Sequence, residues 1–117
     1  NSSRSCFIAE DGDTPVGFIT SHKTDHTPPE WFIWQVGILP EYRGQGLVEE
    51  LQDRVVEVAR EAGAVAIRTT IEPDNFRSFG AFCRMAQRLN SKMEYLRSFK
   101  AAGSEVPEVL YRIPLDS

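Results

Sequence analysis

The sequence has few cysteines, no excess of basic residues and no long apolar run, and each absence excludes a class of protein. Two cysteines, Cys6 and Cys83, stand far apart in 117 residues, which is too few for a disulfide framework. Thirteen basic residues against 17 acidic ones give a formal net charge of −4, which argues against a nucleic-acid-binding domain. No apolar run approaches the ~20 residues that cross a bilayer. The chain is therefore expected to bind neither nucleic acid nor a membrane.

The remaining composition is that of an ordinary globular domain, with 41% hydrophobic and 26% charged residues. Its length predicts a single domain over residues 1–117. Both cysteines have apolar neighbours and are expected to be buried, inert thiols, with a disulfide or a reactive thiol as the alternatives. Free thiols favour a cytoplasmic location. Two histidines and scattered acids lack the spacing of metal ligands, so no metal is expected.

Apolar periodicity predicts a series of strands and helices. Strands are expected over residues 5–9, 16–20, 31–39, 64–71 and 109–113, with a less regular stretch before the last of them. Helices are expected over residues 47–62 and 76–89, and the second should bury Phe76, Phe79, Cys83, Ala86 and Leu89. This order predicts an α/β (α+β) fold, in which helices flank a mixed sheet.

The most informative segment is Arg43-Gly-Gln-Gly-Leu47, which joins a predicted strand to the first helix. Its two glycines allow a tight turn and a close approach of a ligand to the backbone. The first N–H groups of the helix lack internal partners, and the helix dipole adds partial positive charge to them. The turn therefore predicts an anion site, most simply for a phosphate, and Arg43 could add a charge-assisted contact. A glycine-rich connection that binds nothing is the alternative.

Two common phosphate-binding motifs do not fit this turn. A P-loop would need Gly-Lys-Ser/Thr, and a dinucleotide fingerprint would need glycine at Glu49. The segment instead resembles the pyrophosphate-binding R-x-x-G-x-(G/A) turn of the GNAT superfamily of acetyltransferases, although Val48 occupies the last small-residue position. Membership would imply that acetyl-coenzyme A is the co-substrate.

The resemblance implies further coenzyme contacts on both sides of the turn. The strand before it, Trp34–Leu39, would bind the pantetheine arm through its main chain, and Asn75 matches a superfamily Asn that opens a helix beside the coenzyme. Many members have a proton-donating Tyr where this chain has Phe82. The implied coenzyme-binding residues are Val36, Gly37, Ile38, Arg43, Gly44, Gln45, Gly46, Leu47, Val48, Asn75, Ser78 and Phe82.

Three longer segments resemble one branch of the superfamily, the L-2,4-diaminobutyrate acetyltransferases of ectoine biosynthesis. They are Phe32-Ile-Trp-Gln-Val36, Thr69-Thr-Ile-Glu-Pro-Asp-Asn75 and Leu110-Tyr-Arg-Ile-Pro-Leu115. The branch implies a mostly antiparallel sheet and transfer of an acetyl group to the 4-amino group of diaminobutyrate. Members normally begin with a further strand and two helices, so the chain is expected to be N-terminally truncated. Arg68 stands where the branch tends to have Glu, and this departure bears on acceptor specificity.

A small-molecule amine acceptor is expected to bind in a site with an aromatic wall and carboxylates. Trp34 is the aromatic candidate, with a plain core tryptophan as its alternative, and Glu105 and Glu108 are the acidic candidates. His22 and His26 are expected to be surface residues, and the sequence identifies no catalytic base. A homodimer is possible, because relatives are commonly dimers.

Three functions remain open at this point. The first is acetylation of diaminobutyrate, and the second keeps the coenzyme but acts on another small amine or a peptide N-terminus. The third is a non-catalytic, coenzyme-binding remnant, which the missing N-terminal elements and Phe82 would favour.

Overall fold

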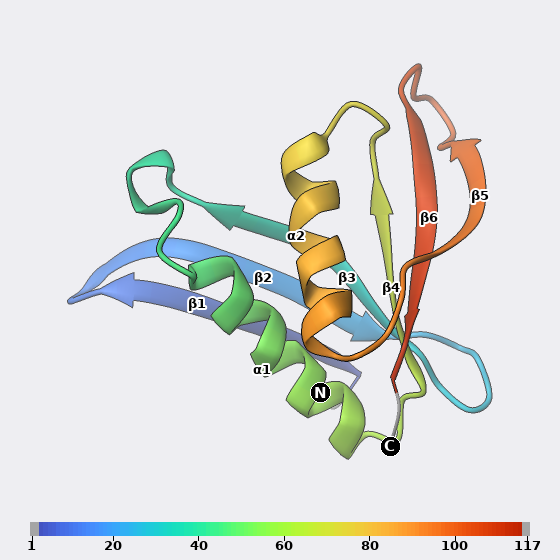
Figure 1. Ribbon diagram of the computed structural model, residues 1–117, viewed down its shortest axis with the longest axis horizontal. Coiled ribbons are helices and arrows are strands. Elements are labelled where there is room, and N and C mark those ends of the chain that lie inside the picture. Colours follow the sequence, from blue (N-terminus) through green and yellow to red (C-terminus); the bar gives the residue numbers. More distant parts are fainter. Residues whose placement is uncertain (1–2, 116–117) are drawn as a thin grey trace.

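The computed structural model describes residues 3–115 and contains one six-stranded sheet and two α-helices (Figure 1). The strands are β1 (Arg4–Asp11), β2 (Thr14–Lys23), β3 (Trp31–Ile38), β4 (Ala66–Ile71), β5 (Glu94–Lys100) and β6 (Pro107–Pro114). The helices are α1 (Leu47–Glu61) and α2 (Phe76–Arg88), and a single 3₁₀ turn, η1 (Pro40–Tyr42), precedes α1.

The spatial order of the strands is β1-β2-β3-β4-β6-β5. Every neighbouring pair is antiparallel except β3 and β4, which run parallel. The predicted mixed, mostly antiparallel sheet is thus confirmed. The sequence analysis missed β5, a sheet-edge strand whose side chains are mostly exposed and therefore show no apolar alternation.

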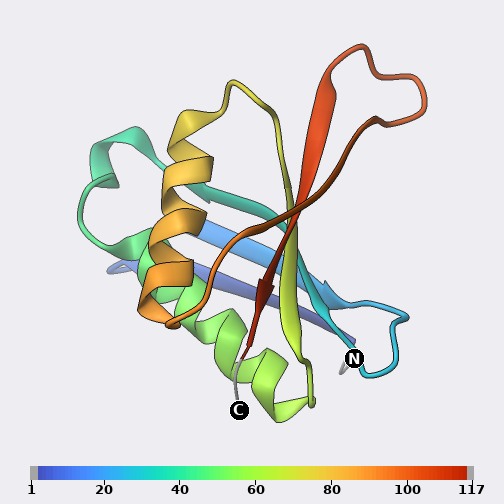
Figure 2. The same ribbon diagram turned by 45° about the vertical axis from the view of Figure 1, so that its right-hand side comes forward.

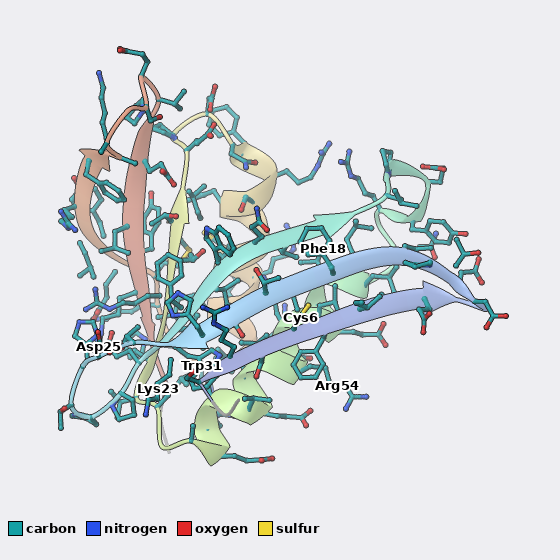
Figure 3. The ribbon with its side chains drawn as sticks, turned by 180° about the vertical axis from the view of Figure 1, so that it is seen from behind. Cys6, Phe18, Lys23, Asp25, Trp31 and Arg54 are labelled. Carbon is teal, nitrogen blue, oxygen red and sulfur yellow. The ribbon has the colours of Figure 1, made fainter. Side chains whose placement is uncertain are left out.

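Both helices cover the same face of the sheet, as the two ribbon views show (Figures 1 and 2). The core between them and the sheet contains Trp31, Ile33 and Phe82, all at most 1% exposed. Seen from behind, the other face of β1, β2 and β3 carries no helix of the described chain (Figure 3). It presents Ile8 and Trp34, which are 60% and 64% exposed.

The predicted buried side of α2 is partly wrong. Phe76 and Phe79 are 76% and 40% exposed, and the helix instead buries Ala81, Phe82, Met85 and Ala86. Apolar residues lie on two sides of this segment. Because α2 lies over the gap between β3 and β4, the side that carries Phe82 faces the core. Phe79 packs edge-on against Tyr111 of β6 with ring centroids 5.6 Å apart.

The expectation of buried thiols is wrong for Cys6. Alternation along β1 turns Phe7 and Ala9 toward the core and exposes Cys6 on the uncovered face. Cys83 is half-buried, and its thiol donates a hydrogen bond to the sulfur of Met93 at 3.6 Å. Both thiols are free, so the disulfide alternative is not realised.

Strands β3 and β4 diverge soon after they meet. They pair only where Trp31–Ile33 lies beside Ile67–Thr69, and the hydroxyl of Thr69 donates to the carbonyl of Ile33 at 3.1 Å where this pairing ends. The register between β2 and β3 skips Trp34, which forms a β-bulge at the same level. The sheet therefore opens beyond Ile33, with α2 over the opening (Figure 1).

A buried carboxylate holds the strands together below this opening. Glu30 accepts hydrogen bonds from Nε of Arg68 on β4 and from Nε of Arg112 on β6, the latter at 3.1 Å. Arg112 also donates to Glu94 of β5 at 3.1 Å. Burial alone would raise the pKa of Glu30, but the hydrogen bonds and charges of the two guanidinium groups outweigh it and lower that pKa.

Replacing Glu30 with Gln should therefore destabilise the fold in a pH-dependent way. Loss of the buried charge should reduce the free energy of unfolding by about 3 kcal/mol at pH 7, the low end for a broken buried ion pair. A carboxyl whose pKa is lowered by folding stabilises above its unfolded pKa, near ~4.3, and loses that contribution as pH falls through the folded pKa. Urea denaturation at pH 7 and at pH 3 should show the difference between wild type and Glu30→Gln shrinking in acid.

Glu94→Gln provides the control for this experiment. Glu94 pairs with Arg112 at the sheet surface, so its replacement should reduce the free energy of unfolding by less than about 1 kcal/mol. A Glu30→Gln deficit that stays constant from pH 7 to pH 3 would contradict the assignment.

Candidate functional site

The turn before α1 has the geometry of an anion site. Gly44 and Gly46 both have positive φ angles, +78° and +82°, which glycine adopts readily. Gly46 is the N-cap of α1 and has no side chain to cap the helix, and the first intrahelical bond runs from the N–H of Glu50 to its carbonyl at 3.1 Å. The N–H groups at the start of α1 thus lack intrahelical acceptors and carry the positive end of the helix dipole.

The turn is fixed to the rest of the sheet by η1. The hydroxyl of Tyr42 donates to a carboxylate oxygen of Asp11, at the tip of the β1–β2 hairpin, at 2.7 Å. This hydrogen bond is the main cause that raises the pKa of Tyr42. Pro40, which the sequence predicts to stop β3, begins η1. The single turn of η1 therefore lies between β3 and the glycine turn.

A hollow of about 420 Å³ lies beside the turn. Its walls include predicted coenzyme residues from β3, the turn and the start of α1: Ile38, Arg43, Gly44, Gly46, Leu47 and Val48. The valine that departs from the family motif is half-buried there, and α1 still begins at Leu47. The side chain of Gln45 bends back toward the carbonyl of Glu41 at 3.5 Å and does not line this hollow.

Two arginines of α2 complete this hollow, and the sequence analysis missed both. Arg77 and Arg84 face the turn, and Nε of Arg84 lies 3.6 Å from a carboxylate oxygen of Glu49. Their spacing of two helical turns is the only signal in the sequence, because which side of α2 faces α1 depends on tertiary packing. With Arg43 they bring three guanidinium groups to the N-terminus of α1.

A second hollow, of about 270 Å³, lies where β3 and β4 diverge. It brings together predicted residues that are far apart in the sequence: Trp34, Val36, Asn75, Ser78 and Phe82. Asn75 caps α2, since its side-chain oxygen accepts a hydrogen bond from the N–H of Ser78 at 3.1 Å. Its amide nitrogen remains as a donor at the entrance to α2.

The backbone of β3 is orientated for main-chain contacts in this opening. Leu39 donates its N–H to the carbonyl of Val16 on β2 at 2.8 Å. Peptide groups along a strand alternate in direction, so those of Val36 and Ile38 point away from β2, toward the opening. The N–H of Gly37 points toward β2. Gly37 instead leaves room for the ring of Phe18, which would lie 2.7 Å from an added Cβ.

The candidate acceptor residues separate into two groups. Trp34 lines the second hollow and is 64% exposed, so the core-tryptophan alternative is wrong, and Trp31 has that role. Glu105 is exposed in the β5–β6 connection and Glu108 is half-buried at the start of β6, and neither lines a hollow described above. His22 and His26 are exposed, as expected.

Across residues 3–115 we find no cluster of three or more His, Cys, Asp or Glu side chains able to hold a metal ion. Within the same range, no helix has the length and apolar character needed to span a membrane.

A sheet that opens beside the N-terminus of its first helix, with a glycine turn at that point, is the architecture of acyl-coenzyme A-dependent acyltransferases. The chain belongs to the acetyltransferase (GNAT) family, whose model matches residues 1–89.

Two curated relatives carry the same name. The chain is 40% identical to an L-2,4-diaminobutyric acid acetyltransferase of Streptomyces coelicolor over 91% of its own length and 66% of the relative's. It is 37% identical to the Halomonas elongata protein of that name over 93% of its length and 59% of the relative's. The chain thus spans less than two thirds of either relative.

Solved structures show the same fold. Diaminobutyrate acetyltransferase EctA from Paenibacillus lautus, in complex with L-2,4-diaminobutyric acid and coenzyme A, matches with a TM-score of 0.78 at 24% identity, covering 97% of this chain and 70% of that one. The NatC complex bound to Gag peptide and CoA matches with a TM-score of 0.79 at 18% identity, covering 95% and 71%.

Replacing Gly46 with Glu should abolish coenzyme A binding and leave the domain folded. The side chain would put a negative charge at the helix N-terminus, and a non-glycine residue with positive φ costs roughly 1–2 kcal/mol. Calorimetric titration with coenzyme A measures the binding, and thermal unfolding measures the fold.

Gly63→Glu is the matched control. Gly63 also has a positive φ, +79°, and open space around its Cβ position, but it follows the C-terminal end of α1. This variant should lose similar stability and keep its coenzyme affinity. Undiminished binding by Gly46→Glu would place the diphosphate elsewhere.

Proposed function

We propose that this chain forms the catalytic part of an N-acetyltransferase that moves the acetyl group of acetyl-coenzyme A to the 4-amino group of L-2,4-diaminobutyrate. The observation that carries this proposal is the alignment of two hollows along β3, one at the glycine turn and one at the strand opening. The names and identities of the two curated relatives support diaminobutyrate as the acceptor.

The residues present fit the coenzyme. The free N–H groups at the start of α1 and the guanidinium groups of Arg43, Arg77 and Arg84 suit its phosphates. The peptide groups of Val36 and Ile38 suit the amides of its pantetheine arm, which would pair with β3 in place of β4. Ser78 and Phe82 then lie beside the thioester end.

The acceptor amine must lose a proton before it attacks the thioester carbonyl. With a pKa near ~10.4 this costs about 4.6 kcal/mol at pH 7. Ile33, Trp34 and Phe82 form the apolar part of a cleft that also has polar walls, and contact of the amine with them would disfavour the ammonium form by desolvation. The N–H of Ile38 points into the opening and is the β3 donor best directed to polarise the carbonyl, whereas the N–H of Gly37 points toward β2.

Transfer in this site is direct and needs no covalent intermediate on the protein. Phe82 has no proton to give to the departing thiolate, so this proton comes from water or from the ammonium that forms on attack. The Cys83 thiol donates to Met93 and does not line the cleft.

The remaining proposals concern domain organisation, cellular location and oligomeric state. Residues 1–117 are proposed to form one domain, and the two free thiols favour the cytoplasm. A homodimer is also proposed, because β1 is a sheet edge with unpaired backbone groups.

Asn75→Asp should separate helix capping from coenzyme binding. Aspartate caps as well as asparagine, so the free energy of unfolding should change by less than about 0.5 kcal/mol. The lost amide donor and the added negative charge should raise the KM for acetyl-coenzyme A about tenfold. Asn75→Ala is the comparison, and it should lose about 1 kcal/mol of stability as well. An unchanged KM in Asn75→Asp would limit Asn75 to capping.

Thiol release from acetyl-coenzyme A should be fastest with L-2,4-diaminobutyrate when diaminobutyrate, ornithine, lysine and a peptide are offered separately to the intact protein. We expect kcat/KM for diaminobutyrate to exceed the others by about tenfold or more, since one methylene contributes about 1–3 kcal/mol to discrimination. Equal rates would favour a broader amine acetyltransferase. Coenzyme binding without any turnover would favour the non-catalytic remnant.

A further inference from the structure

A third and larger hollow, of about 940 Å³, lies on the uncovered face of the sheet. It runs over the end of β1 and β2 that is distant from the glycine turn, where Cys6, Lys23 and Asp25 are labelled in Figure 3. None of the residues predicted to bind the coenzyme lines it. The proposed function so far gives this hollow no role.

Trp34 connects this hollow with the strand opening. It lines both the large hollow and the opening between β3 and β4. The bulge makes this possible, because the register between β2 and β3 passes from Ile33 to Gln35 and leaves Trp34 unpaired. A molecule in the large hollow therefore reaches the opening past the indole ring, from the face opposite to the helices.

The wall of the hollow is positively charged, although the chain has a net charge of −4. Arg4 of β1 and Lys23 of β2 line it, and the described residues form no ion pair with either. Asp25 is its one acidic residue within residues 3–115. The wall thus offers two cationic groups to an anion.

The ring of His22, beside these cations, is held by an aromatic contact. His22 pairs with Arg4 across β1 and β2, and its ring stacks on Phe32 with centroids 5.4 Å apart. Thr20 also lines the hollow, and its hydroxyl oxygen is buried without a hydrogen-bond partner among the described residues.

Resting on the proposed function, we infer that the large hollow binds the α-carboxylate of the acceptor through Arg4 and Lys23. The acceptor's distal amine then passes Trp34 to the thioester. Arg4 lies two residues from Cys6 along β1, and His22 lies two residues from Thr20 along β2. Two residues of a strand span roughly 7 Å, and the backbone of diaminobutyrate together with an arginine side chain bridges this distance. The hollow therefore selects a free diamino acid, since the residue at a peptide N-terminus has an amide in place of the carboxylate.

Steady-state kinetics of the intact protein with two acceptors tests this inference. L-2,4-Diaminobutyrate has the carboxylate, and 1,3-diaminopropane is the same molecule without it. In the double variant Arg4→Gln/Lys23→Gln, the KM for diaminobutyrate should rise about 10- to 100-fold, the range for a lost charge-assisted hydrogen bond. The KM values for diaminopropane and acetyl-coenzyme A should change less than twofold, and so should kcat.

Two further variants control the experiment. Arg54 is an exposed cation of α1 that does not line the hollow, so Arg54→Gln should leave every constant unchanged. Arg4→Lys/Lys23→Arg keeps both charges and should restore most of the affinity for diaminobutyrate. Failure of this charge-conserving variant to restore affinity, or an equal rise in KM for both acceptors, would overturn the inference. An unchanged KM for diaminobutyrate in the double Gln variant would overturn it as well.

The inference and the proposed function fail in different ways. If the wild-type protein acetylates neither acceptor, the proposed function is wrong. Calorimetric titration of L-2,4-diaminobutyrate in the presence of coenzyme A then tests the hollow directly. Binding by wild type that the double Gln variant loses would support the carboxylate subsite, and no binding by wild type would refute it.

Discussion

The short pairing between β3 and β4 is the constraint on which the rest of the structure depends. The two strands share only the stretch from Trp31 to Ile33, and beyond it the peptide groups of β3 face an opening. Main-chain groups away from water require partners. Glu30 links the strands on the closed side of this opening, because its carboxylate binds arginines of both β4 and β6. The sheet is thus held closed at its base and leaves one strand edge available to a ligand.

The electrostatics of the site are local and opposite in sign to those of the whole chain. Arg43, Arg77 and Arg84 meet the N-terminus of α1 on a protein with a net charge of −4. Glu49 pairs with Arg84 at that position, so a carboxylate already occupies part of the positive region. A coenzyme phosphate would therefore compete with Glu49 for Arg84, and its net gain there is smaller than three free guanidinium groups would provide.

Local signals in the sequence predicted those parts of the site that local geometry determines. The glycines at positions 44 and 46 and the helix cap at Asn75 each follow from a few adjacent residues, and the structure has the turn and the cap where they were expected. The rotation of α2, the edge strand β5 and the exposure of Cys6 depend on contacts between distant segments. For the same reason the two-turn spacing of Arg77 and Arg84 places them on one side of α2 but does not show that this side faces the glycine turn.

The bulge at Trp34 lets one residue contribute to both faces of the sheet. Side chains of a regular strand alternate between the faces, so a single residue normally contributes to one face only. The coenzyme hollow lies on the helical side, and the large hollow lies on the uncovered side. Because the register omits Trp34, its indole ring forms a wall of both the opening and the large hollow. If the acceptor binds in the large hollow as proposed, donor and acceptor approach from opposite faces of the sheet and meet beside this residue.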